Sequence, residues 1–275
     1  MNVSNLKAVL AALFLIVWIV IGVVTMLVAR LLRSRLVYRF PLLFHGVVAR
    51  LFGLQVEVVG EVGEHRPIVF ASNHISYMDV FVLGGQLEGA FVAKSEVASW
   101  PVFGKLAKLQ NTMFLERRRQ RAAEQVVELK DRLGSNTNLI LFPEGTSTDG
   151  TGVAPYRSSL FAAFEGMWVQ PVTVAYLTVD GVPMTQSQRD AYAWYLPDPV
   201  GAPQTPNKPF AAHFFAGLGL KGRAQVKILL HEPVLVAAGQ RKAVAAACER
   251  SVREGLVKLL AETEQHEVAE QSSPA

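Results

Sequence analysis

The sequence predicts an α/β protein: a layered, mixed sheet flanked by helices, with an N-terminal transmembrane helix. Three observations support this fold class. Residues 8–29 carry no charge, apolar β-branched runs alternate with helical patterns from residue 55 onward, and 51% of the 275 residues are hydrophobic. We expect residues 1–52 to form a membrane anchor with an interfacial helix, residues 53–264 a single folded domain, and residues 265–275 a polar tail.

The N-terminal apolar segment is long enough to cross a membrane. Its 22 residues would rise about 33 Å as a helix, against a bilayer core of about 30 Å. A cleaved signal peptide is the alternative, but its apolar core is usually shorter, at about 7–15 residues. Arginines follow the segment at positions 30, 33, 35 and 39, whereas only Lys7 precedes it. The positive-inside rule therefore predicts the inner (cytoplasmic) membrane, with the catalytic domain on the cytoplasmic side. Residues 42–54 are too short to span and are expected to lie at the interface or to pack on the domain.

The basic residues are concentrated at the N-terminus. The first 52 residues hold six basic and no acidic side chains, whereas the rest of the chain holds 21 basic and 23 acidic ones. This distribution favours a lipid bilayer as the partner and predicts no nucleic-acid binding. The lone Cys248 excludes an intramolecular disulfide and a multi-cysteine metal site, and no His-Glu-x-x-His motif is present. We expect neither a metal nor a cofactor.

Strands and helices alternate along the predicted domain. Strands are expected at residues 55–59, 68–71, 90–93, 112–115, 138–142, 171–176 and 225–230. Helices are expected at residues 78–86, 100–109, 120–133, 158–165 and 241–264. Residues 180–210 contain six prolines and are expected to be a long irregular segment, of the kind that often shapes a substrate site.

A histidine and an aspartate follow the second predicted strand at a spacing that suits acid–base catalysis. His74 precedes Asp79 by five positions, and Asp79 begins the next predicted helix. A carboxylate that binds one ring N–H of His74 fixes the tautomer and leaves the other nitrogen as a base. The alternative is a helix-capping aspartate beside an incidental histidine, because this spacing arises by chance in about one such chain in four.

A second polar block ends the predicted strand at 138–142. The run Phe142-Pro143-Glu144-Gly145-Thr146 stops the strand with proline and allows a tight turn at glycine. Glu144 would then be a carboxylate directed into the end of the sheet, where open α/β sheets bind ligands. An ordinary Pro-Glu-Gly turn explains part of this run but not the whole set.

These blocks, in this order, resemble the glycerolipid (lysophospholipid) acyltransferases, typified by bacterial 1-acylglycerol-3-phosphate acyltransferases. Asn73-His74 to Asp79 resembles the family's first motif, and Phe142 to Thr146 its third. Phe114-Leu115-Glu116-Arg117 is similar to the second motif, and Val169-Gln170-Pro171-Val172 to the fourth. The resemblance covers residues 50–235.

The resemblance implies a role for each matched residue and makes residues 53–264 an acyltransferase domain. His74 would be the general base and Asp79 its orienting partner. Arg117 would bind an anion, and the other acceptor-site residues would be Asn73, Phe114, Glu144, Gly145 and Thr146. The implied reaction moves a fatty acyl group from an acyl-carrier protein (ACP) or coenzyme A thioester to the free hydroxyl of a lysolipid.

One departure from the family pattern leaves the acceptor open. The third motif often continues with arginine after the threonine, but here Ser147, Thr148 and Asp149 follow, and the next basic residue is Arg157. A phosphate usually has several cationic donors. We expect 1-acyl-sn-glycerol-3-phosphate as acceptor, with lyso-ornithine lipid as the alternative, because residues 149–161 and 192–195 resemble that subgroup. A non-catalytic lipid-binding protein and a thioester hydrolase are further alternatives.

Overall fold

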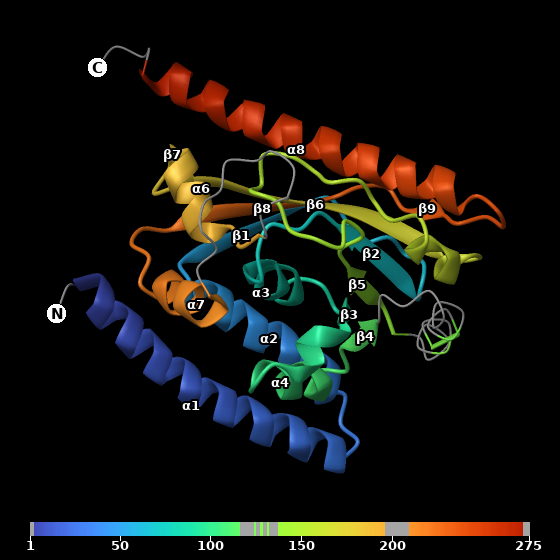
Figure 1. Cartoon of the computed structure of the whole chain (residues 1–275), viewed down its shortest axis with the longest axis horizontal. Coiled ribbons are helices and arrows are strands. Elements are labelled where there is room, and N and C mark those ends of the chain that lie inside the picture. The colour runs from blue at the N-terminus through green and yellow to red at the C-terminus, as the bar shows by residue number, and fades with distance from the viewer. Residues whose placement is uncertain are drawn as a thin grey trace.

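A mixed β-sheet runs through the middle of the molecule (Figure 1), as the sequence predicted. The computed structural model describes residues 3–115, 124, 127, 128, 131, 137–195 and 209–271. Strand order is β1-β8-β6-β2-β5-β3-β4, and β7 and β9 pair with β6. The strands are β1 (Leu54–Val59), β2 (Ile68–Ser72), β3 (Ala90–Lys94), β4 (Met113–Leu115), β5 (Leu139–Leu141), β6 (Trp168–Val179), β7 (Val182–Pro183), β8 (Ala224–Leu230) and β9 (Val234–Leu235). In the series β6-β2-β5-β3-β4, each strand is parallel to the next, whereas β8 is antiparallel to β6.

Helices cover both faces of the sheet. Figure 1 shows α8 (Arg241–Gln271) above one face, with α3, α2, α7 and α1 below the other. The helices of the lower layer are α1 (Val3–Leu31), α2 (Leu36–Leu51), α3 (Met78–Gly84), α4 (Phe103–Leu109) and α7 (Phe210–Leu218). Helix α6 (Gln186–Tyr192) and the 3₁₀ helices η1 (Ser95–Ser99) and η3 (Leu160–Phe164) complete the described elements.

Strand β2 is buried on both sides, which explains its continuous apolar sequence. Ile68 and Phe70 belong to the core below the sheet, whereas Val69 and Ala71 belong to the core beneath α8. A strand between two layers of helices must be apolar on both faces, and each fully buried large side chain contributes about 1.5–3 kcal/mol. The loop that leaves β2 therefore starts from a rigid position.

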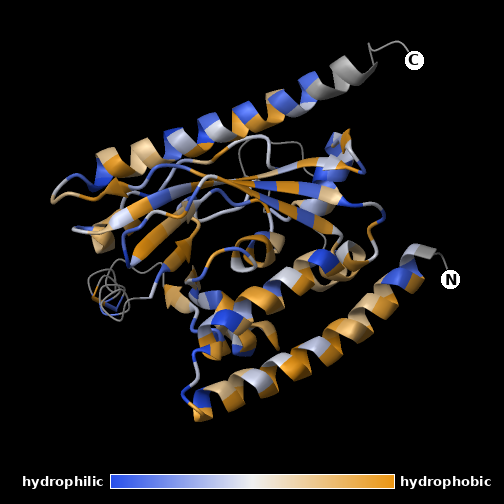
Figure 2. Cartoon of the chain, turned by 180° about the vertical axis from the view of Figure 1, so that it is seen from behind, coloured by the Kyte–Doolittle hydropathy of each residue, from blue (hydrophilic) through white to orange (hydrophobic). Residues whose placement is uncertain are grey.

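Helix α1 is apolar along almost its whole length (Figure 2) and is long enough to cross a membrane. Both of its ends are nevertheless bonded to the rest of the molecule. Lys7 donates to the carbonyl of Leu220, and Arg30 donates to the carbonyl of Leu109 at 2.6 Å and to Asn111 Oδ1 at 2.8 Å. The face turned away from the domain is exposed and apolar, with Leu10, Leu13, Ile16, Val17, Val20, Val24 and Leu27 all more than half exposed.

The element predictions were wrong at several places outside the central strands. The predicted helix at 100–109 begins only at Phe103, because residues 95–99 form a 3₁₀ turn and Trp100 is extended. The predicted helix at 158–165 is a short 3₁₀ helix, and the segment 180–210 contains β7 and α6. Helix α8 continues to Gln271. The helix predicted at 120–133 falls largely outside the described residues.

Candidate active site

The loop between β2 and α3 brings His74 and Asp79 together. His74 Nδ1 lies 2.8 Å from Asp79 Oδ2. A carboxylate can only accept, so Nδ1 carries the hydrogen and Nε2 is left with a lone pair. Asp79 is fully buried, whereas the His74 side chain is 23% exposed. Within the described residues Nε2 has no hydrogen-bond partner. The arrangement can take a proton from a molecule in solvent contact.

Asp79, in the first turn of α3, also holds the loop that precedes this helix. The backbone N–H groups of Ile75 and Ser76 donate to the same Oδ2 at 2.7 and 2.9 Å. These contacts close the loop into a tight turn. The predicted alternative of a helix-capping aspartate was wrong, because the cap position of α3 is Tyr77 and no side chain bonds there. The loop contacts and the imidazole contact instead share one oxygen, and they fix the carboxylate beside His74.

Asn73 fastens the loop to β6. Its side-chain amide donates to the Val174 carbonyl at 2.9 Å and accepts from the Val174 N–H at 2.8 Å. The residue is fully buried, so both polar ends are used on the backbone of β6. This side chain continues the pairing of β2 with β6, which ends at Ser72 and Val172. This is the geometry of a residue that positions the loop.

The third motif lies directly beside His74, because β5 is the parallel neighbour of β2. The Phe142 ring stacks on the His74 imidazole, with centroids 4.0 Å apart and planes at 18°. Glu144 is buried, and its two oxygens accept from the backbone N–H groups of His74 and Ala154, each at 2.7 Å. Burial raises the pKa of Glu144 to about 8, and the charge of Asp79 adds to this rise.

An arginine occupies the space that the missing side chain of Gly145 leaves beside the third motif. The φ of Gly145 is +64°, and a methyl group added there would lie 2.7 Å from the Cζ and Nε atoms of Arg157. The exposed Arg157 is held in place by its backbone N–H, which donates to the Pro143 carbonyl at 3.0 Å. Thr146 follows in the same loop and is half-buried. A guanidinium thus lies against this loop although the residue after Thr146 is not basic.

The described residues of the second and fourth motifs lie away from the contact between His74 and Asp79. Phe114 is half-buried on β4, and β5 and β3 lie between that strand and β2. Arg117 lies outside the described residues. The fourth motif forms the start of β6, where Gln170 is buried and bonds to the backbone of Glu61, Gly63 and His231. This glutamine positions neighbouring loops.

Three contacts around His74 and Asp79 were not predicted from the sequence. Thr148 N donates to the His74 carbonyl at 2.8 Å, and Trp194 N donates to the Ile75 carbonyl at 3.0 Å. The Tyr176 hydroxyl donates to Asp79 Oδ1 at 2.9 Å. A tyrosine inside an otherwise apolar run was the available signal for Tyr176, because a buried phenol usually has a hydrogen-bond partner.

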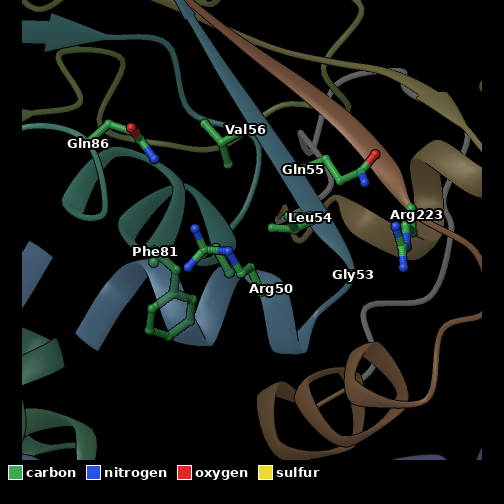
Figure 3. A pocket seen from close by; sticks show the side chains of 10 residues that line it. Arg50, Gly53, Leu54, Gln55, Val56, Phe81, Gln86 and Arg223 are labelled. Carbon is green, nitrogen blue, oxygen red and sulfur yellow. The ribbon is translucent and has the colours of Figure 1, made fainter. Parts of the chain in front are cut away.

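A separate hollow of about 500 Å³ lies between α2, α3 and β1 (Figure 3). Arg50 and Phe81 line it from α2 and α3, Gln86 from the turn after α3, and Arg223 from just before β8. None of the described site residues predicted from the sequence borders it. Within the described residues, no cluster of three or more His, Cys, Asp or Glu could hold a metal ion.

Comparisons with known proteins agree with the motifs. A family model described as Acyltransferase matches residues 55–177. The lyso-ornithine lipid O-acyltransferase of Brucella abortus is 38% identical over 226 residues, which cover 78% of this chain and 80% of that protein. The 1-acyl-sn-glycerol-3-phosphate acyltransferase of Neisseria meningitidis is 32% identical over 152 residues, 54% of this chain and 58% of that protein.

A solved structure shares the fold. The crystal structure of the 1-acyl-sn-glycerophosphate (LPA) acyltransferase PlsC from Thermotoga maritima superimposes with a TM-score of 0.65 at 21% identity, over 93% of this chain and 97% of that one. This likeness shows the fold alone. The sequence relatives and the family model show more: the chain belongs to the acyltransferase family and is an acyltransferase, as the motifs predicted.

Proposed function

We propose that the enzyme transfers a fatty acyl group from an acyl thioester to the free hydroxyl of a lysolipid, with His74 as general base. One observation carries this proposal: the buried Asp79 holds Nδ1, while the partly exposed imidazole keeps Nε2 available. A hydroxyl is too weakly acidic to react without a base, and imidazole is well suited to this near neutral pH. The reaction needs no metal and no cofactor.

The proposed reaction has two steps, in which the proton taken from the hydroxyl is returned to the leaving thiolate. Nε2 takes the hydroxyl proton as the oxygen attacks the thioester carbonyl, and a tetrahedral intermediate forms. The intermediate collapses, the carbon–sulfur bond breaks, and the imidazolium returns the proton to the thiolate of ACP or coenzyme A. Asp79 keeps the imidazole in the required tautomer and stabilises its charged form.

The acceptor that the observations favour is lyso-ornithine lipid, whose head group carries a carboxylate and an amine. The relatives named lyso-ornithine lipid O-acyltransferase include one 38% identical over 78% of this chain. The guanidinium of Arg157 lies against Gly145 of the third motif, and a carboxylate can pair with an arginine in a bidentate manner. Arg117 and Phe114 are proposed as further acceptor contacts.

A second acceptor, 1-acyl-sn-glycerol-3-phosphate, is supported by a relative of that activity at 32% identity. Purified enzyme should be supplied with each acceptor and with acyl-ACP or acyl-CoA. We expect a higher kcat/KM with lyso-ornithine lipid. A preference for the phosphate-bearing acceptor would contradict this assignment while leaving the reaction class intact.

The role of His74 is tested in the same assay. His74→Ala should lower kcat roughly 100- to 10,000-fold in a protein that still folds. Near wild-type activity in that variant would exclude the mechanism. Thiol release at an undiminished rate without lysolipid would indicate a hydrolase, and absence of product with every acceptor would indicate a lipid-binding protein.

We further propose that α1 attaches the enzyme to the inner membrane, with the domain on the cytoplasmic side. Lys7 and Arg30, near opposite ends of α1, both bond to the domain, which supports a helix lying along the membrane surface rather than across the bilayer. Its exposed apolar face would enter the lipid. A tag at the N-terminus should then be reached by a reagent confined to the cytoplasm; labelling from the opposite side would support a transmembrane helix.

A further inference from the structure

Both oxygens of the Asp79 carboxylate have defined partners, and they differ in origin. Oδ2 accepts from His74 and from the backbone of Ile75 and Ser76 in the loop before α3. Oδ1 instead accepts the hydroxyl of Tyr176 at 2.9 Å, from a residue 97 positions later in the chain. Asp79 is 0% and Tyr176 3% exposed, so the contact is shielded from water. In such surroundings a hydrogen bond to a charged group is strong.

Tyr176 lies beside an irregularity in the pairing of β6. The pairing of β6 with β8 shifts register immediately after this residue, between Tyr176 and Thr178. A bulge turns the side chains beside it and increases local twist, and bulges often occur next to active sites. Arg189 of α6 donates to the Tyr176 carbonyl at 3.2 Å, which holds the bulged segment from outside.

Tyr176 can act only as a donor to Asp79. Burial raises the pKa of its phenol well above the usual value, and the neighbouring carboxylate raises it further. The phenol therefore keeps its proton over the working pH range and donates to the carboxylate throughout. A donor on Oδ1 withdraws negative charge from Asp79 and fixes the carboxylate plane with Oδ2 toward His74.

We propose that Tyr176 is a positioning residue of the reaction, which orients Asp79 and sets the basicity of His74 through it. This inference rests on the proposed role of His74 as base. Tyr176 is buried behind Asp79 and acts on the imidazole only through that carboxylate. The other titratable groups that face this pair are Glu144 at the His74 backbone, Tyr77 and Tyr192 beside Tyr176, and Arg189 at its carbonyl.

The chain offers a matched control for this proposal. Tyr192 packs its ring on Tyr176, with centroids 6.1 Å apart, and its hydroxyl is buried without a hydrogen-bond partner in the described structure. Tyr176→Phe and Tyr192→Phe each remove one buried hydroxyl from the same aromatic pair. The only designed difference is the hydrogen bond to Asp79.

The experiment compares kcat/KM against pH for wild type and both variants. In Tyr176→Phe, Asp79 keeps more negative charge and pairs more strongly with the imidazolium form of His74. The acidic limb should move up by about half a pH unit or more, and kcat should fall roughly tenfold. Tyr192→Phe should match wild type in both respects.

The outcomes are distinguishable. If the two variants share the wild-type limb while His74→Ala is inactive, Tyr176 has no positioning role but the base assignment holds. An active His74→Ala would overturn both. Reduced folding of Tyr176→Phe does not obscure the result, because the midpoint of the limb is independent of the amount of active enzyme.

Discussion

The imidazole of His74 lies flat on the ring of Phe142, with centroids 4.0 Å apart. The two residues come from loops that follow neighbouring parallel strands, β2 and β5. The carboxyl ends of parallel strands meet at one edge of the sheet, so a local pattern on each strand produces a contact between them. The imidazole is therefore held by a carboxylate at one nitrogen and by a ring across its face.

Replacing Phe142 by leucine should lower activity without unfolding the protein. The stacked pair is worth about 0.5–1.5 kcal/mol beyond apolar burial, so losing it should reduce kcat roughly 2- to 10-fold as the imidazole gains freedom. Steady-state rates at saturating acceptor check this. Phe91→Leu is the control, because Phe91 packs on Phe142, with ring centroids 6.4 Å apart, but its imidazole contact is with His45 and not with His74.

Glu144 should make stability depend on pH. Its folded pKa of about 8 exceeds the ordinary value of 4.5, so between these values the folded state binds more protons than the unfolded state. The free energy of unfolding should then fall as pH rises from about 5 to 8, by up to about 1.4 kcal/mol per pH unit. Denaturant melts of wild type and Glu144→Gln test this, since the variant lacks the titrating group. Parallel pH dependences in the two proteins would contradict the assignment.

Gly145→Ala should disturb acceptor binding by displacing Arg157. The added methyl group would lie 2.7 Å from the guanidinium, and φ of +64° adds a strain of about 1–2 kcal/mol. Gly166→Ala is the matched control: its φ is +83°, but no atom lies within 4 Å of the added methyl. Both variants should lose stability, and only Gly145→Ala should raise the acceptor KM. Arg157→Ala should raise the same KM; equal values in all four proteins would exclude Arg157 from the acceptor site.

Asn73→Ala should affect stability and turnover together. It leaves two buried backbone groups of Val174 unpaired, at a cost of about 2–4 kcal/mol, and frees the loop that carries His74. Asn138 makes a similar pair of backbone contacts at the other end of β2, to Ile68 N at 3.0 Å and Glu88 O at 2.9 Å. Asn138→Ala should therefore lower the melting temperature but leave kcat of the folded enzyme unchanged. A normal kcat in Asn73→Ala would contradict the proposed positioning role.

The sequence predicted the parts of the site that are local. His74 and Asp79 are five residues apart, and the strand before them is wholly apolar, so both the loop and the contact follow from nearby residues. The position of Glu144 after β5 was predictable for the same reason. The family and the mixed sheet were confirmed by the comparisons.

The remaining contacts depend on strand order, which no short pattern encodes. Tyr176 reaches Asp79 because β6 is the neighbour of β2, although 97 residues separate the pair. Helix α7 was missed because prolines precede it and its apolar run is short. The attachment of α1 at both ends was also unpredictable, because Leu109 and Leu220 lie far from it in sequence.

The pair of hydrogen bonds between Asn73 and Val174 has a consequence for the protein during its synthesis on the ribosome. These residues are 101 positions apart, so the first motif leaves the ribosome about 5–20 s before the strand that fixes it, at about 5–20 residues per second. During that interval the nascent chain carries His74 and Asp79 without the β6 contacts that orient them. A message truncated before β6 would therefore encode both signature residues without the strand contacts that orient them.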